Sequence, residues 1–183
     1  MSNRAAVNLL QSRAGGKTER CHNIPHHGSY SVAAHSWGVA MLMHYIWPED
    51  FPRLALYCLS HDVPEAWVGD IPSPTLRYTP GLGDILACTE ATLNRSIGLP
   101  AEKDLNYEDL GKLKACDRLE FWLWAREQLA MGNRFAQEGK TEIERYFKET
   151  PLPKAAQELY EELRNTEVLP RQQGILKEMN YVS

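Results

Sequence analysis

The sequence predicts an all-α protein. Apolar residues recur at helical spacing along most of the 183 residues, and clusters of proline and glycine separate these periodic segments. No segment shows the sustained alternation of apolar and polar residues that a half-buried strand requires. Hydrophobic residues make up 43% of the chain, which at this length can fill one sizeable core, so we expect a single domain over residues 1–183.

The first predicted helix is capped by Ser29 or Ser31 and runs to about residue 46. Trp47 ends it, because a residue that precedes proline, here Pro48, is pushed out of the helical region. Its spacing predicts a buried face made of Ala33, Val39, Ala40, Leu42, Met43 and Ile46.

The second predicted helix begins at Pro52, a residue suited to a first helical turn. Leu54, Cys58, His61 and Glu65 follow it at spacings of four, three and four. Pro64 lacks an amide hydrogen and would clash with the carbonyl of Ser60. We therefore expect this helix to stop near Asp62 and a new helix to start with Pro64 in its first turn.

The rest of the chain alternates between breaks and helices. Residues 69–81 contain three prolines and two glycines and are expected to form a loop. Helical periodicity returns over residues 82–97, which Gly98 closes, and over residues 107–131. Short amphipathic segments at 141–149 and 153–165 complete the prediction, and the tail after Pro170 is expected to be peripheral.

Composition excludes several classes of protein. The net charge of −4 argues against a nucleic-acid-binding surface, which normally carries a basic stripe. The sequence has no run of eighteen apolar residues and no signal-peptide core near its start, so we expect a soluble cytoplasmic protein that has no membrane partner. The four cysteines are 28 or more positions apart and are expected to be reduced thiols.

Asp117 is the most informative single residue for chemistry. It falls on an apolar helix face together with Leu110, Leu113, Phe121 and Trp124, where an unpaired carboxylate would be several kcal/mol unfavourable. Asp117 therefore either pairs with Arg118, Lys114 or a distant arginine, or binds a metal. The lone His35 and the adjacent His61 and Asp62 favour the metal, because imidazole and carboxylate are common ligands of divalent first-row ions.

These residues also carry a family resemblance. The order His35, then His61-Asp62, then Asp117 resembles the HD superfamily of metal-dependent phosphohydrolases. Three blocks, AHSWGVAML, HDVPEAWVGDIPSP and AMGNRF, are similar in order and spacing to the bacterial 5'-deoxynucleotidase branch and to its phage relatives, which include dATP triphosphohydrolases. The resemblance covers roughly residues 13–150.

The resemblance implies an HD helical bundle in which His35, His61, Asp62 and Asp117 hold one divalent ion, whether cobalt, manganese, zinc, iron or magnesium. It implies that Glu65 and Asp70 handle the attacking water and the leaving group, and that Arg20 orients the phosphate. It further implies a deoxynucleotide as the small-molecule partner and a homo-oligomeric assembly. The substrate-binding residues expected on this basis are Arg20, Cys21, Asp62, Asp70, Ile71, Pro72 and Ser73.

Elementary chemistry is consistent with these roles. An arginine fork suits a phosphate, and a carboxylate outside the ligand set, such as Glu65, can accept a proton from water. Glu65 is otherwise an ordinary first-turn glutamate. Lys17 and Arg77 are further candidates for contacting a longer phosphate chain, or are plain surface charges.

One position departs from the family pattern. Cys21 stands directly after the arginine, where the deoxynucleotidases place a tryptophan that shapes the wall against the deoxyribose. The smaller side chain leaves either a wider pocket or a gap that another aromatic residue fills, such as Tyr30 or Trp37.

The leading functional hypothesis is a metal-dependent phosphohydrolase that removes the 5'-phosphate or the 5'-triphosphate of a deoxynucleotide. The non-enzyme alternative is a nucleotide-binding regulatory protein that kept the metal ligands but lost turnover. HD-type di-iron oxygenases and multinuclear cyclic-dinucleotide phosphodiesterases need further histidine ligands, and this chain has no histidine after His61.

Overall fold

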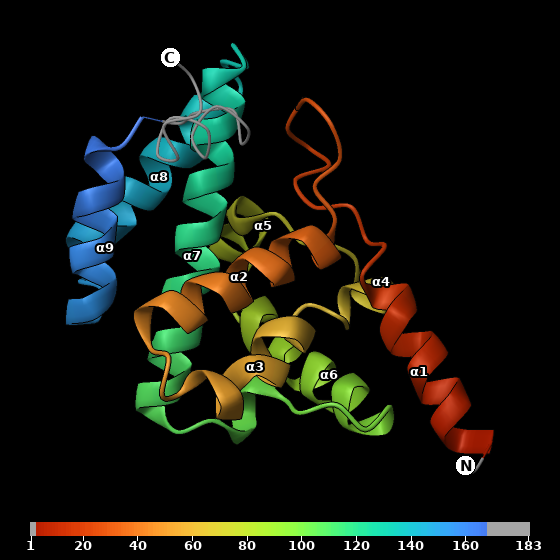
Figure 1. The fold of residues 1–183 in the computed structure, drawn as a ribbon. Helices are drawn as coiled ribbons and strands as arrows, with labels where there is room; N and C mark the ends of the chain where they lie inside the picture. Colours follow the sequence, from red (N-terminus) through yellow and green to blue (C-terminus); the bar gives the residue numbers. More distant parts are fainter. Residues whose placement is uncertain (1–2, 168–183) are drawn as a thin grey trace, which may run out of the picture.

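The structure, a computed structural model, describes residues 3–167, and within that range its regular elements are helices without a strand (Figure 1). The predicted all-α class is therefore confirmed. The elements are α1 (Asn3–Gly15), α2 (Val32–Ile46), α3 (Phe51–Ser60), α4 (Glu65–Val68), α5 (Ser73–Tyr78), α6 (Leu82–Ser96), the 3-10 turn η1 (Glu102–Asp104), α7 (Tyr107–Ala130), α8 (Ala136–Glu149) and α9 (Lys154–Asn165).

Several helix ends follow the predicted local chemistry. Ser31, rather than Ser29, caps α2, because its hydroxyl accepts a hydrogen bond from the backbone N–H of Ala34 at 3.3 Å. Trp47 follows the last residue of α2, as its place before Pro48 predicts. The break between α3 and α4 is also confirmed: α3 ends at Ser60, and α4 begins directly after Pro64.

Two predictions of secondary structure were wrong, and one helix was missed. Residues 69–81 are not entirely loop, since α5 lies within them; its Pro74 sits in the first turn, where a missing amide hydrogen is harmless. The segment expected at 141–149 begins earlier, at Ala136. The helix α1 was not expected, and its weak pattern has a simple cause: most of its side chains, among them Leu9 and Leu10, are exposed.

The main core lies where α2 crosses α3 and the long helix α7, with α8 and α9 packed on the far side of α7 (Figure 1). Val39, Ala40, Leu42 and Met43 of the predicted face are buried there and Ile46 is half-buried, but Ala33 is exposed. Trp122 and Trp124 are buried and Tyr146 packs against the core, so these aromatic residues serve packing within the chain.

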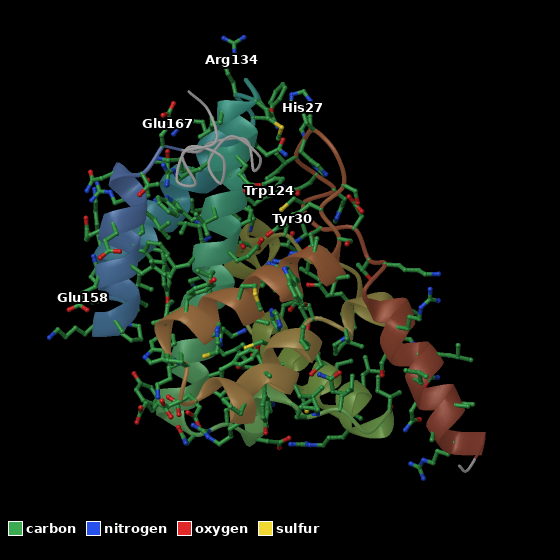
Figure 2. All side chains as sticks on the ribbon, viewed as in Figure 1. His27, Tyr30, Trp124, Arg134, Glu158 and Glu167 are labelled. Carbon is green, nitrogen blue, oxygen red and sulfur yellow. The ribbon has the colours of Figure 1, made fainter. Side chains whose placement is uncertain are left out.

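A second, smaller cluster joins the segment before α2 to the end of α7. The ring of Tyr30 is stacked on that of Trp124, with ring centroids 4.6 Å apart (Figure 2). Backbone hydrogen bonds fix the same segment, since the N–H of Arg20 donates to the carbonyl of Tyr30 at 2.8 Å. This cluster places Arg20 and Tyr30 beside the N-terminal half of α2.

Two further expectations can be compared with the structure. Cys21, Cys58, Cys88 and Cys116 are all free thiols, as expected. Between residues 3 and 167, no helix is long and apolar enough to cross a membrane. The tail after Pro170 lies outside the described residues, and the single-domain organisation stays a prediction.

Candidate active site

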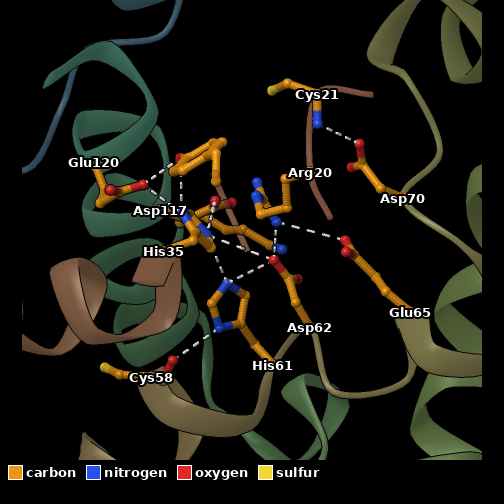
Figure 3. A network of polar contacts seen from close by, with 12 residues as sticks. Arg20, Cys21, His35, Cys58, His61, Asp62, Glu65, Asp70, Asp117 and Glu120 are labelled. Carbon is orange, nitrogen blue, oxygen red and sulfur yellow. Dashed lines mark hydrogen bonds and ion pairs between the residues drawn. The ribbon is translucent and has the colours of Figure 1, made fainter. Parts of the chain in front are cut away.

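Three segments distant in sequence bring the predicted metal ligands together (Figure 3). His35 comes from α2, while His61 and Asp62 lie in the turn between α3 and α4. The Nε2 atoms of the two histidines are 3.3 Å apart, and Asp62 Oδ2 lies 3.5 Å from His35 Nε2 and 3.3 Å from His61 Nε2. Ligand atoms of these three residues all lie within 4.8 Å of one another, so they can share one ion.

Asp117 of α7 joins the cluster through His35. Its Oδ1 lies 3.2 Å from His35 Nε2, although Asp117 falls outside the group whose ligand atoms are all within 4.8 Å of one another. The two basic neighbours that the sequence offered as ion-pair partners make their direct contacts with other groups, although the charge of Lys114 still acts on Asp117. Lys114 Nζ pairs with Glu102 at 2.7 Å, and the guanidinium of Arg118 lies over the ring of Tyr146, 4.1 Å from its centroid.

The hydrogen bonds of His35 and His61 orient the Nε2 atom of each ring toward the other predicted metal ligands. His61 Nδ1 lies 2.9 Å from the backbone carbonyl of Cys58, to which it donates. His35 Nδ1 donates to the carboxylate of Glu120. With Nδ1 protonated in both rings, each Nε2 is the position at which a metal can bind.

Burial and mutual contacts shift the pKa values of these groups. For Asp117, burial alone would raise the pKa, but the hydrogen bond from His35 and the charge of Lys114 hold it well below its usual range. Burial and Arg20 act to lower the pKa of His35, yet its hydrogen bonds to Asp117 and Glu120 raise it to about 9. His35 thus contacts two carboxylates, and a metal that binds at Nε2 would take the place of the proton there.

Arg20 and Glu65 lie directly beside the ligands. The Nη1 of Arg20 pairs with Asp62 and lies 3.5 Å from Glu65 Oε1. Glu65 is the first residue of α4, one helical turn after the two ligands of the α3–α4 turn. Within the described part of the chain, Arg20 Nε and Glu65 Oε2 are buried without a hydrogen-bond partner. Both therefore have capacity left for a ligand.

The surroundings of Glu65 and Arg20 shift the pKa values of both side chains. Burial, followed by the negative charge of Asp62, raises the pKa of Glu65 to about 9. Burial alone would lower the pKa of Arg20, but Asp62, Tyr30 and Asp117 raise it well above its usual value. The site thus combines a fixed positive charge with a carboxyl group of unusually high proton affinity.

Asp70 is held at the edge of the same site by the segment after Arg20. The backbone N–H of Cys21 donates to Asp70 Oδ2 at 2.7 Å, and Nδ1 of the exposed His22 lies 3.5 Å from the same oxygen. Cys21 adopts a positive φ of 53°, which only a few percent of non-glycine residues do. This turn aims the backbone of Cys21 at the carboxylate of Asp70 (Figure 3).

The remaining predicted substrate residues are placed less closely. Ile71 and Pro72 are half-buried next to Asp70, and Ser73 is exposed at the start of α5. Arg77 pairs with Glu142 of α8, so its charge is engaged away from the ligand cluster. Lys17 is exposed. The structure thus brings Arg20 and Glu65 to the metal ligands and Asp70 to the residue after Arg20, whereas it pairs Arg77 with a residue of α8.

The gap left by the small side chain of Cys21 has an aromatic neighbour. Cys21 packs against the cluster of Tyr30 and Trp124, whereas Trp37 is 63% exposed. Of the two aromatic residues considered from the sequence, Tyr30 is the one that lines this region.

Glu120 is a residue of the site that the sequence analysis missed. Glu120 accepts hydrogen bonds from both His35 Nδ1 and the hydroxyl of Tyr30. Glu120 follows Asp117 by three positions, a spacing that puts both carboxylates on one face of α7 and was visible in the sequence. The contact of Tyr30 with Glu120, across 90 positions, had no such signal.

Known proteins resemble this chain in fold and sequence. A dATP triphosphohydrolase of Salmonella phage PMBT28 is 37% identical over 65 residues, which are 28% of this chain and 34% of that protein. The match thus spans about a third of the length of this curated relative.

Solved structures agree on the fold. The cyanophage S-2L HD phosphohydrolase DatZ, bound to dA and one catalytic Zn2+ ion, matches with a TM-score of 0.61 and 20% identity, covering 81% of this chain and 89% of that chain. The PH0347 protein from Pyrococcus horikoshii OT3 matches with a TM-score of 0.64 and 17% identity, covering 87% of this chain and 96% of that chain. The chain therefore has the HD-domain fold predicted from its sequence.

A family model described as 5'-deoxynucleotidase YfbR-like matches residues 16–163, which overlaps the predicted segment 13–150 and extends past its C-terminal end. Because this match covers most of the chain, including all four predicted ligands, the protein belongs to the YfbR-like 5'-deoxynucleotidase family.

Proposed function

We propose that this chain is a metal-dependent phosphohydrolase that cleaves the bond between the 5'-oxygen and the α-phosphorus of a deoxynucleotide. Cleavage of this bond releases phosphate from a monophosphate and triphosphate from a triphosphate. The observation that carries the proposal is the buried cluster of His35, His61 and Asp62, with Asp117 in contact and Arg20 and Glu65 at its edge. The names of the relatives support the same class of reaction.

The residues present fit one divalent ion. Two imidazoles whose Nδ1 atoms are occupied by hydrogen bonds, together with two carboxylates, form a nitrogen and oxygen donor set typical of catalytic first-row metals. When bound, such an ion supplies activation of water and neutralisation of charge on the phosphate. The Zn2+ ion of the cyanophage structure supports zinc as the first ion to test.

The residues beside the ligands suit the binding and proton-transfer steps. Arg20 has a buried Nε that lacks a partner among residues 3–167, and it can donate this N–H to a phosphate oxygen. Glu65 lies beside the ligands, and its buried Oε2 lacks a partner among residues 3–167, so it is the candidate to accept a proton from the attacking water. As water attacks phosphorus and the bond to the 5'-oxygen breaks, that oxygen takes a proton, for which Asp70 is the candidate donor.

Product analysis with purified protein tests the activity. We expect hydrolysis of dAMP, dATP or both in the presence of Zn2+, Mn2+ or Co2+, with phosphate and triphosphate resolved chromatographically. A panel of deoxynucleotides and ribonucleotides then identifies the base and the sugar. Absence of hydrolysis of every substrate with every ion, despite metal binding, would instead support the regulatory nucleotide-binding alternative.

The variant Glu65→Gln tests the role of the base. We expect the rate to fall by about 10²- to 10⁴-fold, because the amide cannot accept the proton, while the metal content per chain remains that of the wild type. Undiminished turnover by this variant would show that Glu65 is not the base.

Self-association and location are further parts of the proposal. The exposed apolar residues Val7, Leu9 and Leu10 of α1 offer a surface for pairing with a second copy of the chain. Light scattering coupled to size-exclusion chromatography measures the oligomeric state directly. A monomer at all concentrations would contradict the proposed self-association. The cytoplasmic location expected from the sequence also stays a proposal.

A further inference from the structure

The predicted catalytic roles leave one half-buried carboxylate of the site, Glu120, without a function. Glu120 lies on α7, and a single oxygen of it, Oε2, accepts hydrogen bonds from both His35 Nδ1 and the hydroxyl of Tyr30. The hydroxyl of Tyr30 lies 3.2 Å from His35 Nδ1, so the three polar groups form a closed triangle. The Glu120 side chain is 14% exposed, which strengthens these contacts relative to a surface pair.

Glu120 is placed to fix the orientation of the His35 ring. It engages Nδ1, while Nε2 on the opposite side of the ring faces His61, Asp62 and Asp117. A rotation of the ring that broke the bond to Glu120 would also turn Nε2 away from the other ligands. Asp117 and Glu120 are three residues apart on the same helix, so α7 supplies both a ligand and the group that orients another ligand.

The chain makes room for Glu120 by means of a glycine. Gly38 lies on α2, three residues after His35, and a Cβ added there would be 2.5 Å from Glu120 Cγ and 3.0 Å from Oε1. Any side chain at this position would push Glu120 away from its present place. The close approach of α2 and α7 at Gly38 therefore depends on the absence of a side chain.

Tyr30 holds Glu120 from the other side. It is buried and stacked on Trp124, which limits the movement of its hydroxyl. The same residue contacts the phosphate-binding candidate, because the Arg20 guanidinium lies over the Tyr30 ring, 5.7 Å from its centroid. Arg20 and Glu120 thus share one rigid support.

We propose that Glu120 is a positioning residue that holds His35 in the orientation needed for metal binding, and that Tyr30 and the missing side chain of Gly38 hold Glu120 in place. The inference rests on the metal site of the proposed function, but it concerns metal binding rather than turnover. Groups of this kind typically change metal affinity by about 10- to 100-fold when they are removed.

Metal affinity of Glu120 variants tests the proposal. Purified apoprotein is titrated with Co2+ in competition with a chelator, and the visible absorption of the bound ion reports the ligand geometry. Glu120→Ala should weaken Co2+ binding by about 10- to 100-fold and alter this spectrum. Glu120→Gln keeps an oxygen that accepts the Nδ1 hydrogen bond, so it should lose less. Glu108→Gln is the matched control, because Glu108 lies on the same helix but is exposed and pairs with Lys112 at 2.6 Å.

A second variant tests the same inference without removing any polar group. Gly38→Ala should weaken Co2+ binding because the new methyl group displaces Glu120. Its control is Gly111→Ala in α7, where an added Cβ meets nothing within 4 Å and the affinity should not change. If Glu120→Ala does not fold, the Co2+ affinities of Gly38→Ala and Glu120→Gln still test the positioning role of Glu120.

The outcomes separate this inference from the proposed function. Wild-type Co2+ affinity and spectrum in Glu120→Ala, or in both Gly38→Ala and Glu120→Gln, would overturn the positioning role even if the wild-type enzyme hydrolyses deoxynucleotides. A weakened affinity in these variants, with both controls unchanged, supports the role even if no substrate is turned over.

Discussion

Two carboxylates on α7, the buried Asp109 and the half-buried Asp117, lie eight residues apart, about 12 Å along the helix axis. Both carboxylate oxygens of Asp109 accept hydrogen bonds from the guanidinium of Arg53, and Asn106 Nδ2 donates a further one at 2.8 Å. Asp117 contacts His35 at 3.2 Å, while the neighbouring Lys114 and Arg118 serve other groups. A carboxylate neutralised by an arginine and an amide contributes to the fold, whereas one that faces imidazoles is available to a metal.

The largest effect that follows from this contrast concerns the ligand itself. Asp117→Asn should abolish metal-dependent turnover and reduce metal affinity by more than the about 10- to 100-fold expected for an outer partner, because it replaces the charged carboxylate of a proposed ligand with a neutral amide. Far-UV circular dichroism should still show the wild-type helix content. Metal binding by this variant at wild-type affinity would mean that Asp117 is not a ligand.

The next effect is stabilisation by the ion. A ligand that binds only the folded state at 100 times its Kd raises the free energy of unfolding by about 2.7 kcal/mol, which for a chain of this size corresponds to a rise in Tm of roughly 5–10 °C. Differential scanning fluorimetry with and without Zn2+ should show this rise in the wild type and in Asp109→Asn, but not in Asp117→Asn. An equal rise in all three proteins would place the ion elsewhere.

The opposite pattern is expected at Asp109. Asp109→Asn should lower the free energy of unfolding by about 1–2 kcal/mol, since charged hydrogen bonds to a buried carboxylate are lost but the Arg53 side chain is 55% exposed and partly screened. Denaturant unfolding monitored by circular dichroism measures the change. Metal affinity should remain that of the wild type. If Asp109→Asn lowered both the stability and the metal affinity, Asp109 would contribute to the metal site as well as to the fold.

The effect of Asp109→Asn on the free energy of unfolding should depend on pH. The hydrogen bonds from Arg53, opposed by a smaller effect of burial, lower the pKa of Asp109 in the folded chain. A carboxylate with a lowered pKa stabilises the fold at pH values above its unfolded pKa, near 4, and this contribution is lost as the pH falls through the folded value. Asp109→Asn should therefore differ from the wild type most at neutral pH, and the difference should shrink below about pH 4.

The same helix shows which parts of the site could be predicted from the sequence. Asp117 was identified because an acidic residue on an apolar face needs a special partner. That rule applies equally to Asp109, yet it gave no expectation for this residue, because Arg53 lies 56 positions away and its pairing is set by tertiary packing. Sequence reasoning thus identifies a carboxylate that needs compensation, but only the fold decides whether the partner is an arginine or a metal site.

Helix prediction succeeded where backbone chemistry is local and failed where packing decides. The break at Pro64 and the cap at Ser31 follow from the hydrogen bonds available to single residues. The helix α1 has no apolar stripe because its contacts are confined mainly to α4, and α5 lies in a proline-rich segment that reads as a loop. Glu120 was detectable from its spacing to Asp117, but its hydrogen bonds required the position of α2.

The smallest predicted effect is a change in stability caused by a substitution at Gly111, which lies between the two carboxylates on α7. Gly111 is two residues after Asp109 and six before Asp117 on α7, and an added Cβ would meet nothing within 4 Å. Gly111→Ala should raise the free energy of unfolding by about 0.5–1 kcal/mol, because alanine has less conformational freedom than glycine to lose in the unfolded chain. Denaturant unfolding should show this gain in Gly111→Ala alone and in the double variant with Asp109→Asn. Metal affinity should stay unchanged in both variants, because the added methyl group does not move Asp117 or Glu120. A change in metal affinity would show that the region around Asp109 and the region around Asp117 are energetically coupled.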